Sequence, residues 1–93
     1  MSNPQVGNNT EKNRFELAVD GSMVVAEYNL LPGAIAFTHT LTPSALRGRG
    51  LAGQVVKAGL DHARAQNLKV IPQCWYVAEY IGQHPEYQSL VER

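Results

Sequence analysis

The chain has 93 residues, of which 44% are hydrophobic and 17% charged, a balance typical of one soluble globular domain. Its eight basic and eight acidic side chains cancel. This argues against non-specific binding to nucleic acid or to an anionic membrane, because both need a positive excess. No apolar run approaches the roughly 20 residues of a membrane-spanning helix, and the N-terminal residues do not have the pattern of a secretory signal.

The cysteine and histidine content bears on compartment and metal binding. Cys74 is the single cysteine and has no partner for an internal disulfide, so a cytoplasmic, reducing location is expected. The three histidines and Cys74 lack the close spacing of a structural metal site, so no metal is expected. The sequence is compatible with a monomer or a weak dimer.

Residues 1–13 are polar and without periodicity, and they are predicted to be a flexible leader. Residues 14–93 are predicted to form a single compact domain. Its first half predicts strands over residues 15–19, 22–30 and 34–42. Asp-Gly and Pro-Gly turns separate these strands, so an antiparallel three-stranded meander is expected.

The second half of the domain predicts a strand–helix–strand unit. Apolar residues recur at helical spacing from Leu51 to Ala63, which indicates an amphipathic helix of about four turns. A strand over residues 68–71 follows and stops at Pro72, and a right-handed crossover would place it parallel to the third strand. A short helix over residues 75–83 and a last turn follow. The fold class is therefore α/β in an α+β layered arrangement: the meander, a β-α-β unit and a short C-terminal helix.

The segment between the third strand and the long helix carries the chemistry: Arg47, Gly48, Arg49, Gly50, Leu51, Ala52 and Gly53. Its glycines allow tight backbone angles and close approach of a ligand. The unpaired N–H groups at the start of the following helix attract an anion, and two arginines add positive charge. These features predict a cradle for a phosphate or pyrophosphate. The alternative is a glycine-rich loop that only turns the chain.

Two other phosphate motifs do not fit. A P-loop needs a lysine and a hydroxyl residue after its last glycine, whereas Gln54 follows Gly53. A dinucleotide fold needs a first strand directly before the glycines, whereas a three-stranded meander comes first here.

The segment resembles a known family. Arg47-x-x-Gly50-x-Ala52 is similar to the Gln/Arg-x-x-Gly-x-Gly/Ala signature of the GNAT superfamily of N-acetyltransferases, whose loop binds the pyrophosphate of acetyl-CoA. A compact single-domain branch of that family is similar over residues 15–91. The segments that carry this wider resemblance are Phe37-Thr38-His39-Thr40, Pro43, Ile71-Pro72-x-Cys74 and His84-Pro85-Glu86-Tyr87.

The resemblance implies an enzyme that binds acetyl-CoA and transfers its acetyl group to an amine. The pyrophosphate would rest on residues 47–53, and the pantetheine arm would pass Leu41 and Thr42. The chain lacks the segment that covers the acceptor in larger members, so an open acceptor side is expected. That favours a large, macromolecular acceptor or weak selectivity.

One departure concerns the general base, an acidic residue on this strand in larger members of the family. Members of the branch often carry an acidic residue after Thr-His-Thr, whereas this chain has Leu41. The departure favours the alternative function, a CoA-binding or sensing module without catalysis. It also favours Cys74 as the catalytic residue, because a thiol at a helix start has a lowered pKa. The other interpretation of Cys74 is a small buried hydrophobic residue.

The remaining candidates are weaker. His39 would be a base near Cys74 if it pointed inward, but a strand histidine is more often hydrogen-bonded in the structure. Tyr76, Tyr80 and Tyr87 are candidates for the acid that protonates the leaving thiolate, and Tyr80 is the first choice because the family places a tyrosine on the corresponding helix.

Overall fold

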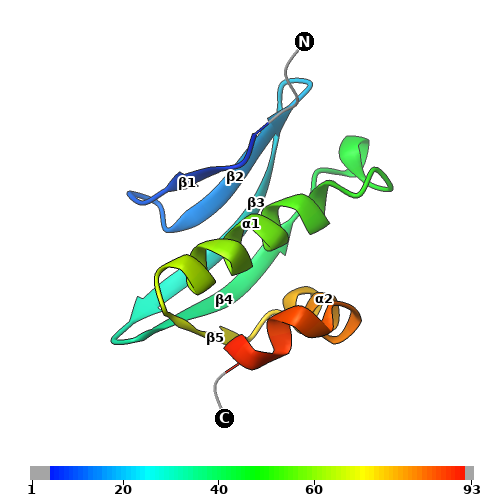
Figure 1. Cartoon of the computed structure of the whole chain (residues 1–93). Coiled ribbons are helices and arrows are strands. Elements are labelled where there is room, and N and C mark those ends of the chain that lie inside the picture. The colour runs from blue at the N-terminus through cyan, green and yellow to red at the C-terminus, as the bar shows by residue number, and fades with distance from the viewer. Residues whose placement is uncertain (1–4, 92–93) are drawn as a thin grey trace.

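The computed structural model describes residues 5–91, which form one twisted sheet with two helices packed beside it (Figure 1). The sheet has five strands in the order β1-β2-β3-β4-β5. Strands β1 to β4 are antiparallel, and β5 is parallel to β4. The strands are β1 (Gly7–Asn9), β2 (Arg14–Val19), β3 (Ser22–Leu31), β4 (Ala34–Leu41) and β5 (Lys69–Pro72). The α-helices are α1 (Leu51–Ala65) and α2 (Trp75–Gln83), and the short 3-10 helices are η1 (Ser44–Leu46) and η2 (Pro85–Leu90).

This architecture confirms the predicted fold class of a meander followed by a β-α-β unit and a short helix. The predicted leader over residues 1–13 is wrong for Gly7–Asn9, which pair with β2 as an edge strand. The side-chain oxygen of Asn8 accepts a hydrogen bond of 2.6 Å from the Tyr28 hydroxyl. The segment Gly7–Asn9 is too short and too polar to show the alternation of a half-buried strand. It is held by backbone pairing, which does not depend on such a pattern, so the sequence could not reveal this strand. Residues 1–4 lie outside the described range.

The apolar stripe of α1 meets the sheet where the largest side chains are. Phe37, Leu17 and Leu60 are fully buried in one cluster that both helices share. Gly59 lets α1 approach closely, because a Cβ built there would lie 2.8 Å from the Phe37 ring and 3.3 Å from the Phe15 ring.

The parallel pairing of β4 with β5 ends early, and this opens the sheet. The last paired residues are Phe37 and Pro72, after which β4 runs on to Leu41 without a β5 partner. The backbone N–H of Cys74 donates to the Phe37 carbonyl at 2.9 Å, and the chain then enters α2. We call the space between the end of β4 and the start of α2 the fork.

A bulge in β4 decides which of its side chains face the helices. Glu27 pairs with His39 but Tyr28 pairs with Phe37, so Thr38 is an extra residue. The bulge shifts the alternation by one residue. Phe37 before it and Thr40 after it both face the helices, whereas His39 and Leu41 face the other way.

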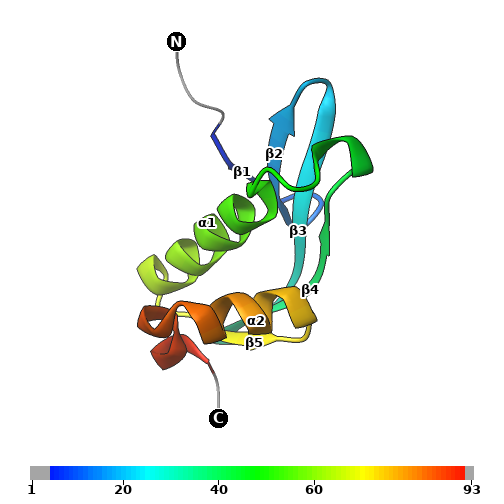
Figure 2. The ribbon, with the colours of Figure 1, turned by 90° about the vertical axis from the view of Figure 1, so that its right-hand side faces the viewer.

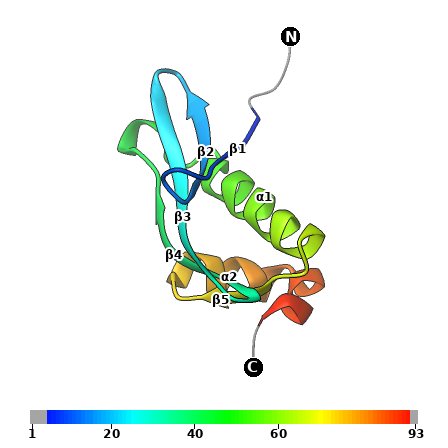
Figure 3. The ribbon, with the colours of Figure 1, turned by 90° about the vertical axis from the view of Figure 1, so that its left-hand side faces the viewer.

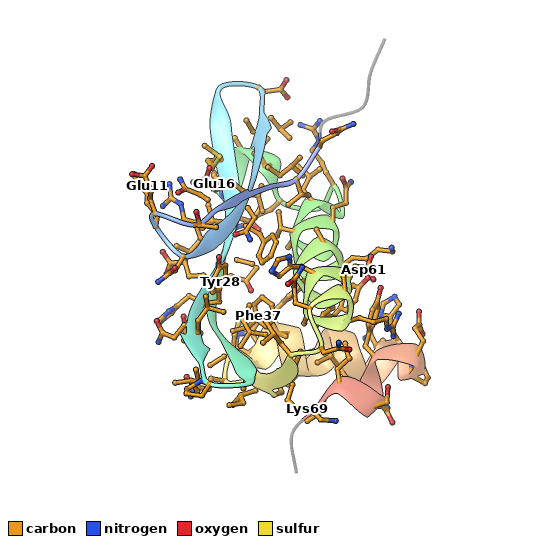
Figure 4. All side chains as sticks on the ribbon, turned by 60° about the vertical axis from the view of Figure 1, so that its left-hand side comes forward. Glu11, Glu16, Tyr28, Phe37, Asp61 and Lys69 are labelled. Carbon is orange, nitrogen blue, oxygen red and sulfur yellow. The ribbon has the colours of Figure 1, made fainter. Side chains whose placement is uncertain are left out.

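The two faces of the sheet differ in cover. The side views show α1 on one side of strands β2 to β4 (Figures 2 and 3). With side chains drawn, Phe37 lies toward α1 and Glu16 lies on the side away from it (Figure 4). The face with Glu16 and Leu41 carries no helix among the described residues, and we call it the open face.

The C-terminal segment is tied to α1 by polar contacts. Tyr87 donates a hydrogen bond of 2.7 Å to Asp61, and the Arg64 guanidinium lies 4.9 Å from the centre of the Tyr87 ring. Burial and the hydrogen bond to Asp61 raise the pKa of Tyr87 to about 12. Tyr87 therefore keeps its proton, and the contact, across the neutral range.

The contact at Gly59 predicts a stability effect. Gly59→Ala should lower the free energy of unfolding by about 1–2 kcal/mol, because overpacking against the buried Phe37 outweighs the gain in helix propensity. Urea denaturation measures the change. Gly82→Ala in α2 is the matched control: a Cβ there meets nothing within 4 Å, so it should stabilise the protein by up to about 1 kcal/mol. Equal effects of both substitutions would contradict the close packing of α1.

Candidate acyl-transfer site

The loop before α1 presents backbone donors at the protein surface. Gly48 and Gly50 adopt positive φ angles of 81° and 72°, which glycine does without steric cost. Gly50 is the N-cap of α1 and makes no side-chain cap, and the first turn holds no acidic residue. The N–H groups at the start of α1 are therefore available to an anion, and the helix dipole favours negative charge there.

A cavity of about 330 Å³ occupies the fork beside this helix start. We call it the inner cavity. Residues from β4, the loop, α1 and α2 line it: Thr40, Thr42, Arg47, Ala52, Cys74, Trp75 and Tyr76. The loop donors and the thiol of Cys74 thus meet at one hollow, so a ligand with an anionic part and a reactive end can contact both.

Cys74 is the N-cap of α2 and is 9% exposed. Its sulfur lies 3.5 Å from Oγ1 of Thr40. Burial raises the pKa of the thiol, but the Thr40 hydroxyl and the backbone N–H groups of Val77 and Tyr76 outweigh burial, so the pKa is lowered overall. These groups stabilise a thiolate, the nucleophilic form of cysteine.

A second hollow of about 440 Å³ lies on the open face, across β4 from the inner cavity. We call it the outer groove. Its lining residues are Arg14, Met23, Val25, Thr40, Leu41, Thr42, Pro43 and Arg47. Thr40, Thr42 and Arg47 line both hollows, so the hollows adjoin at the end of β4.

The residues predicted for the cofactor do not all lie at the inner cavity. Thr42, Arg47 and Ala52 line it, whereas Leu41 lines the outer groove. Arg49 contacts Asp20 in the β2–β3 turn, with 3.0 Å between Nη1 and Oδ2.

The other loop residues shape the helix start. Gly48 and Gly50 set the backbone of the loop, and Leu51 is buried in the core. A Cβ at Gly53 would lie 3.5 Å from the Tyr80 ring and 3.7 Å from the Tyr76 hydroxyl.

The structure places His39 away from Cys74. Its side chain is 68% exposed on the open face, with Nδ1 3.6 Å from Oε1 of Glu27. The bulge at Thr38 is the reason. His39 therefore does not face inward as a base near Cys74 would, and its 3.6 Å contact with Glu27 is longer than the hydrogen bond that the sequence favoured.

Tyr76, rather than Tyr80, lines the inner cavity. The Tyr80 ring stacks on His84 with 3.9 Å between ring centroids. Burial, with a contribution from the Glu79 carboxylate, raises the pKa of Tyr76. Tyr76 therefore stays protonated at neutral pH and is placed to donate a proton to a group in the cavity.

Two cavity residues were missed by the sequence analysis. Thr40 faces the sulfur only because of the bulge, which no sequence pattern signals. Trp75 is 72% exposed. An exposed tryptophan beside a predicted site would indicate binding, but the sequence alone does not show whether a tryptophan is exposed or buried in the core.

Comparison with known proteins identifies relatives of this chain. A family model described as GCN5-related N-acetyl-transferase matches residues 14–90. The protein NATD1 of Gallus gallus is 31% identical over 90 residues, which cover 92% of this chain and 81% of that protein. NATD1 of Mus musculus is 30% identical over the same shares of the two chains. A GCN5-like protein from Staphylococcus aureus, solved by NMR, superposes with a TM-score of 0.76 at 26% identity, over 99% of this chain and 91% of that one.

The chain belongs to the family of GCN5-related N-acetyltransferases, as its loop signature indicated. Among the described residues no helix is long and apolar enough to cross a membrane. Within residues 5–91, no group of three or more metal-ligating side chains is clustered.

The contact between Thr40 and Cys74 predicts a pH effect. Thr40→Val removes the hydroxyl that stabilises the thiolate, so the thiol pKa should rise. The rate at which iodoacetamide alkylates Cys74 can be measured by mass spectrometry at a series of pH values. In Thr40→Val the rise of this rate with pH should move to higher pH, and the rate at pH 7 should be lower. Thr42→Val, at a residue that lines the same cavity without facing the sulfur, should leave the profile in place. A profile unchanged in Thr40→Val would refute this role.

Proposed function

We propose that this protein binds acetyl-CoA at the α1 N-terminus and inner cavity and transfers the acetyl group to an amine. The observation that carries the proposal is the meeting of an uncapped helix start and a thiol with a lowered pKa at one cavity. Membership of the N-acetyltransferase family supports the reaction class.

The surface and the cavity suit different parts of acetyl-CoA. The backbone N–H groups after Gly50 would hold the pyrophosphate, with Arg47 as an additional cation beside them. The cavity of about 330 Å³ is large enough for the pantetheine end but not for the whole molecule. The arm would follow the edge of β4 that β5 leaves unpaired, and the thioester would then lie near Cys74.

Cys74 is proposed as the acyl acceptor in the first step. Its thiolate attacks the thioester carbonyl, the bond from that carbon to the CoA sulfur breaks, and the leaving thiolate takes a proton from Tyr76. In the second step a neutral amine attacks the acetyl group on Cys74, the Cys74 thiolate leaves, and the proton that the nitrogen loses passes by way of the sulfur back to Tyr76. Two easier steps then replace one difficult step.

A CoA-binding module without catalysis is the second candidate. Leu41, in place of an acidic residue, favours it. The two candidates differ in turnover: both bind acetyl-CoA, but only the enzyme releases free CoA.

A side chain that fills the inner cavity should prevent binding. Ala52 lines the cavity from regular helix, whereas a substitution at Gly50 would also strain the backbone because φ is 72°. Ala52→Leu should weaken acetyl-CoA binding at least about tenfold, because the added carbons occupy ligand space. Isothermal titration measures this, with the exposed Ala65→Leu of the same helix as the control. Unchanged binding by Ala52→Leu would place the cofactor elsewhere.

The covalent step predicts a mass change. Mixing the protein with acetyl-CoA and no amine should release a burst of free CoA and add one acetyl group to Cys74, read by intact mass and peptide mapping. Cys74→Ala should lose both signals and still bind acetyl-CoA. If Cys74→Ala keeps most of its turnover with an amine, the transfer is direct and positioning of the two substrates is the main contribution.

A further inference from the structure

The open face carries a hollow that the proposed cofactor site does not use. The outer groove holds about 440 Å³, within the range of small-molecule sites. Thr40 lines it and also lies 3.5 Å from the Cys74 sulfur. The groove therefore adjoins the inner cavity at the residue that contacts the sulfur.

The floor of the groove is apolar. Val25 is buried on the open face without contribution from either helix, since it lies outside the shared cluster. Leu41 is 54% exposed and Met23 is 39% exposed, and Leu41 is the register partner of Val25. Large exposed apolar side chains around a hollow are typical of a binding site. The floor suits an aliphatic or aromatic side chain.

The charged residues that line the groove are both arginines, Arg14 and Arg47. Nε of Arg14 contacts Glu16 at 2.6 Å, and Nε of Arg47 donates to the Thr42 carbonyl at 3.3 Å. Within residues 5–91, no hydrogen bond engages the terminal nitrogens of either guanidinium. No carboxylate lines this groove, and Leu41 stands where the branch often has one. The groove therefore favours an anionic group beside an apolar one.

We propose that the acceptor is an amino acid with an apolar side chain, bound in the outer groove. This inference rests on the proposed function. The side chain lies on Met23, Val25 and Leu41, the carboxylate meets Arg14, and the α-amine lies toward Thr40. The groove residues thus recognise the carboxylate and the apolar side chain, neither of which reacts, and they leave the α-amine at the end of β4.

The acetyl transfer begins at the ammonium of the amino acid, which first loses a proton to solvent. The neutral nitrogen then attacks the acetyl carbonyl carbon, a C–N bond forms, and the C–S bond breaks. The sulfur leaves as a thiolate and receives the second nitrogen proton, directly or through water. The products are an N-acetyl amino acid and a free thiol.

Turnover with a matched set of amines tests the specificity. Leucine should have a higher kcat/KM than alanine, by about three- to fourfold for each methylene buried. Leucine should also exceed leucinamide, although the amide has the more readily deprotonated amine, because leucinamide lacks the carboxylate. Preference for leucinamide, or for a lysine-rich peptide, would overturn the proposal in favour of a protein acceptor.

Two pairs of variants locate the selectivity. Arg14→Gln should reduce the preference for leucine over leucinamide at least about tenfold, the effect of losing a charge-assisted hydrogen bond. Lys12→Gln, at an exposed residue outside the groove, should retain the preference. Leu41→Asn should lose activity on leucine, whereas Leu30→Asn, at a leucine of similar exposure, should retain it. Equal effects within either pair would refute the groove.

A binding measurement separates this proposal from the proposed function. With methionine methyl groups labelled with ¹³C, the Met23 resonance should shift when leucine is added without acetyl-CoA, and should shift less with leucinamide. A shift without turnover would uphold the groove and refute acyl transfer. Turnover without a shift would uphold acyl transfer and refute the groove.

Discussion

The separation of β4 from β5 after Phe37 and Pro72 is the constraint on which the site depends. Because proline has no backbone N–H, Pro72 at the end of β5 cannot donate a hydrogen bond to β4. The Gln73 N–H turns back to the Ile71 carbonyl, and the Cys74 N–H then reaches the Phe37 carbonyl, so the chain leaves the sheet at this point. One hydrogen bond therefore places the thiol, starts α2 beside it, and leaves the end of β4 unpaired on that side.

The end of β4 serves two surfaces because strand residues alternate. Thr40 faces the helices and the thiol, whereas Leu41 beside it faces the open side. The bulge at Thr38 sets this phase. If the strand alternated regularly from Phe37 to Leu41, with Thr38 paired as an ordinary strand residue, Leu41 would face the helices with Phe37, and the hydroxyl of Thr40 would face away from the sulfur. The side chains that border the two hollows thus depend on one irregularity.

Regular elements could be predicted from the sequence, and the irregular ones could not. The apolar spacing gave α2 its observed bounds of Trp75–Gln83, and the Asp-Gly and Pro-Gly turns placed the meander. The position of His39 could not be predicted, because alternation alone cannot reveal a bulge. Tyr76 and Tyr80 are four residues apart and share a helix face, so only the position of α2 beside the fork shows which one reaches the cavity.

The edge strand β1 has a consequence for the behaviour of the protein in solution. It is only three residues long, exposed and polar, yet it occupies the edge of β2, a strand that contains Phe15 and Leu17. An uncovered strand of that composition is a template on which a second chain can pair. The Gly-Asn-Asn segment thus shields the molecule from self-association through its sheet edge, a protection against aggregation that is separate from any contribution to catalysis.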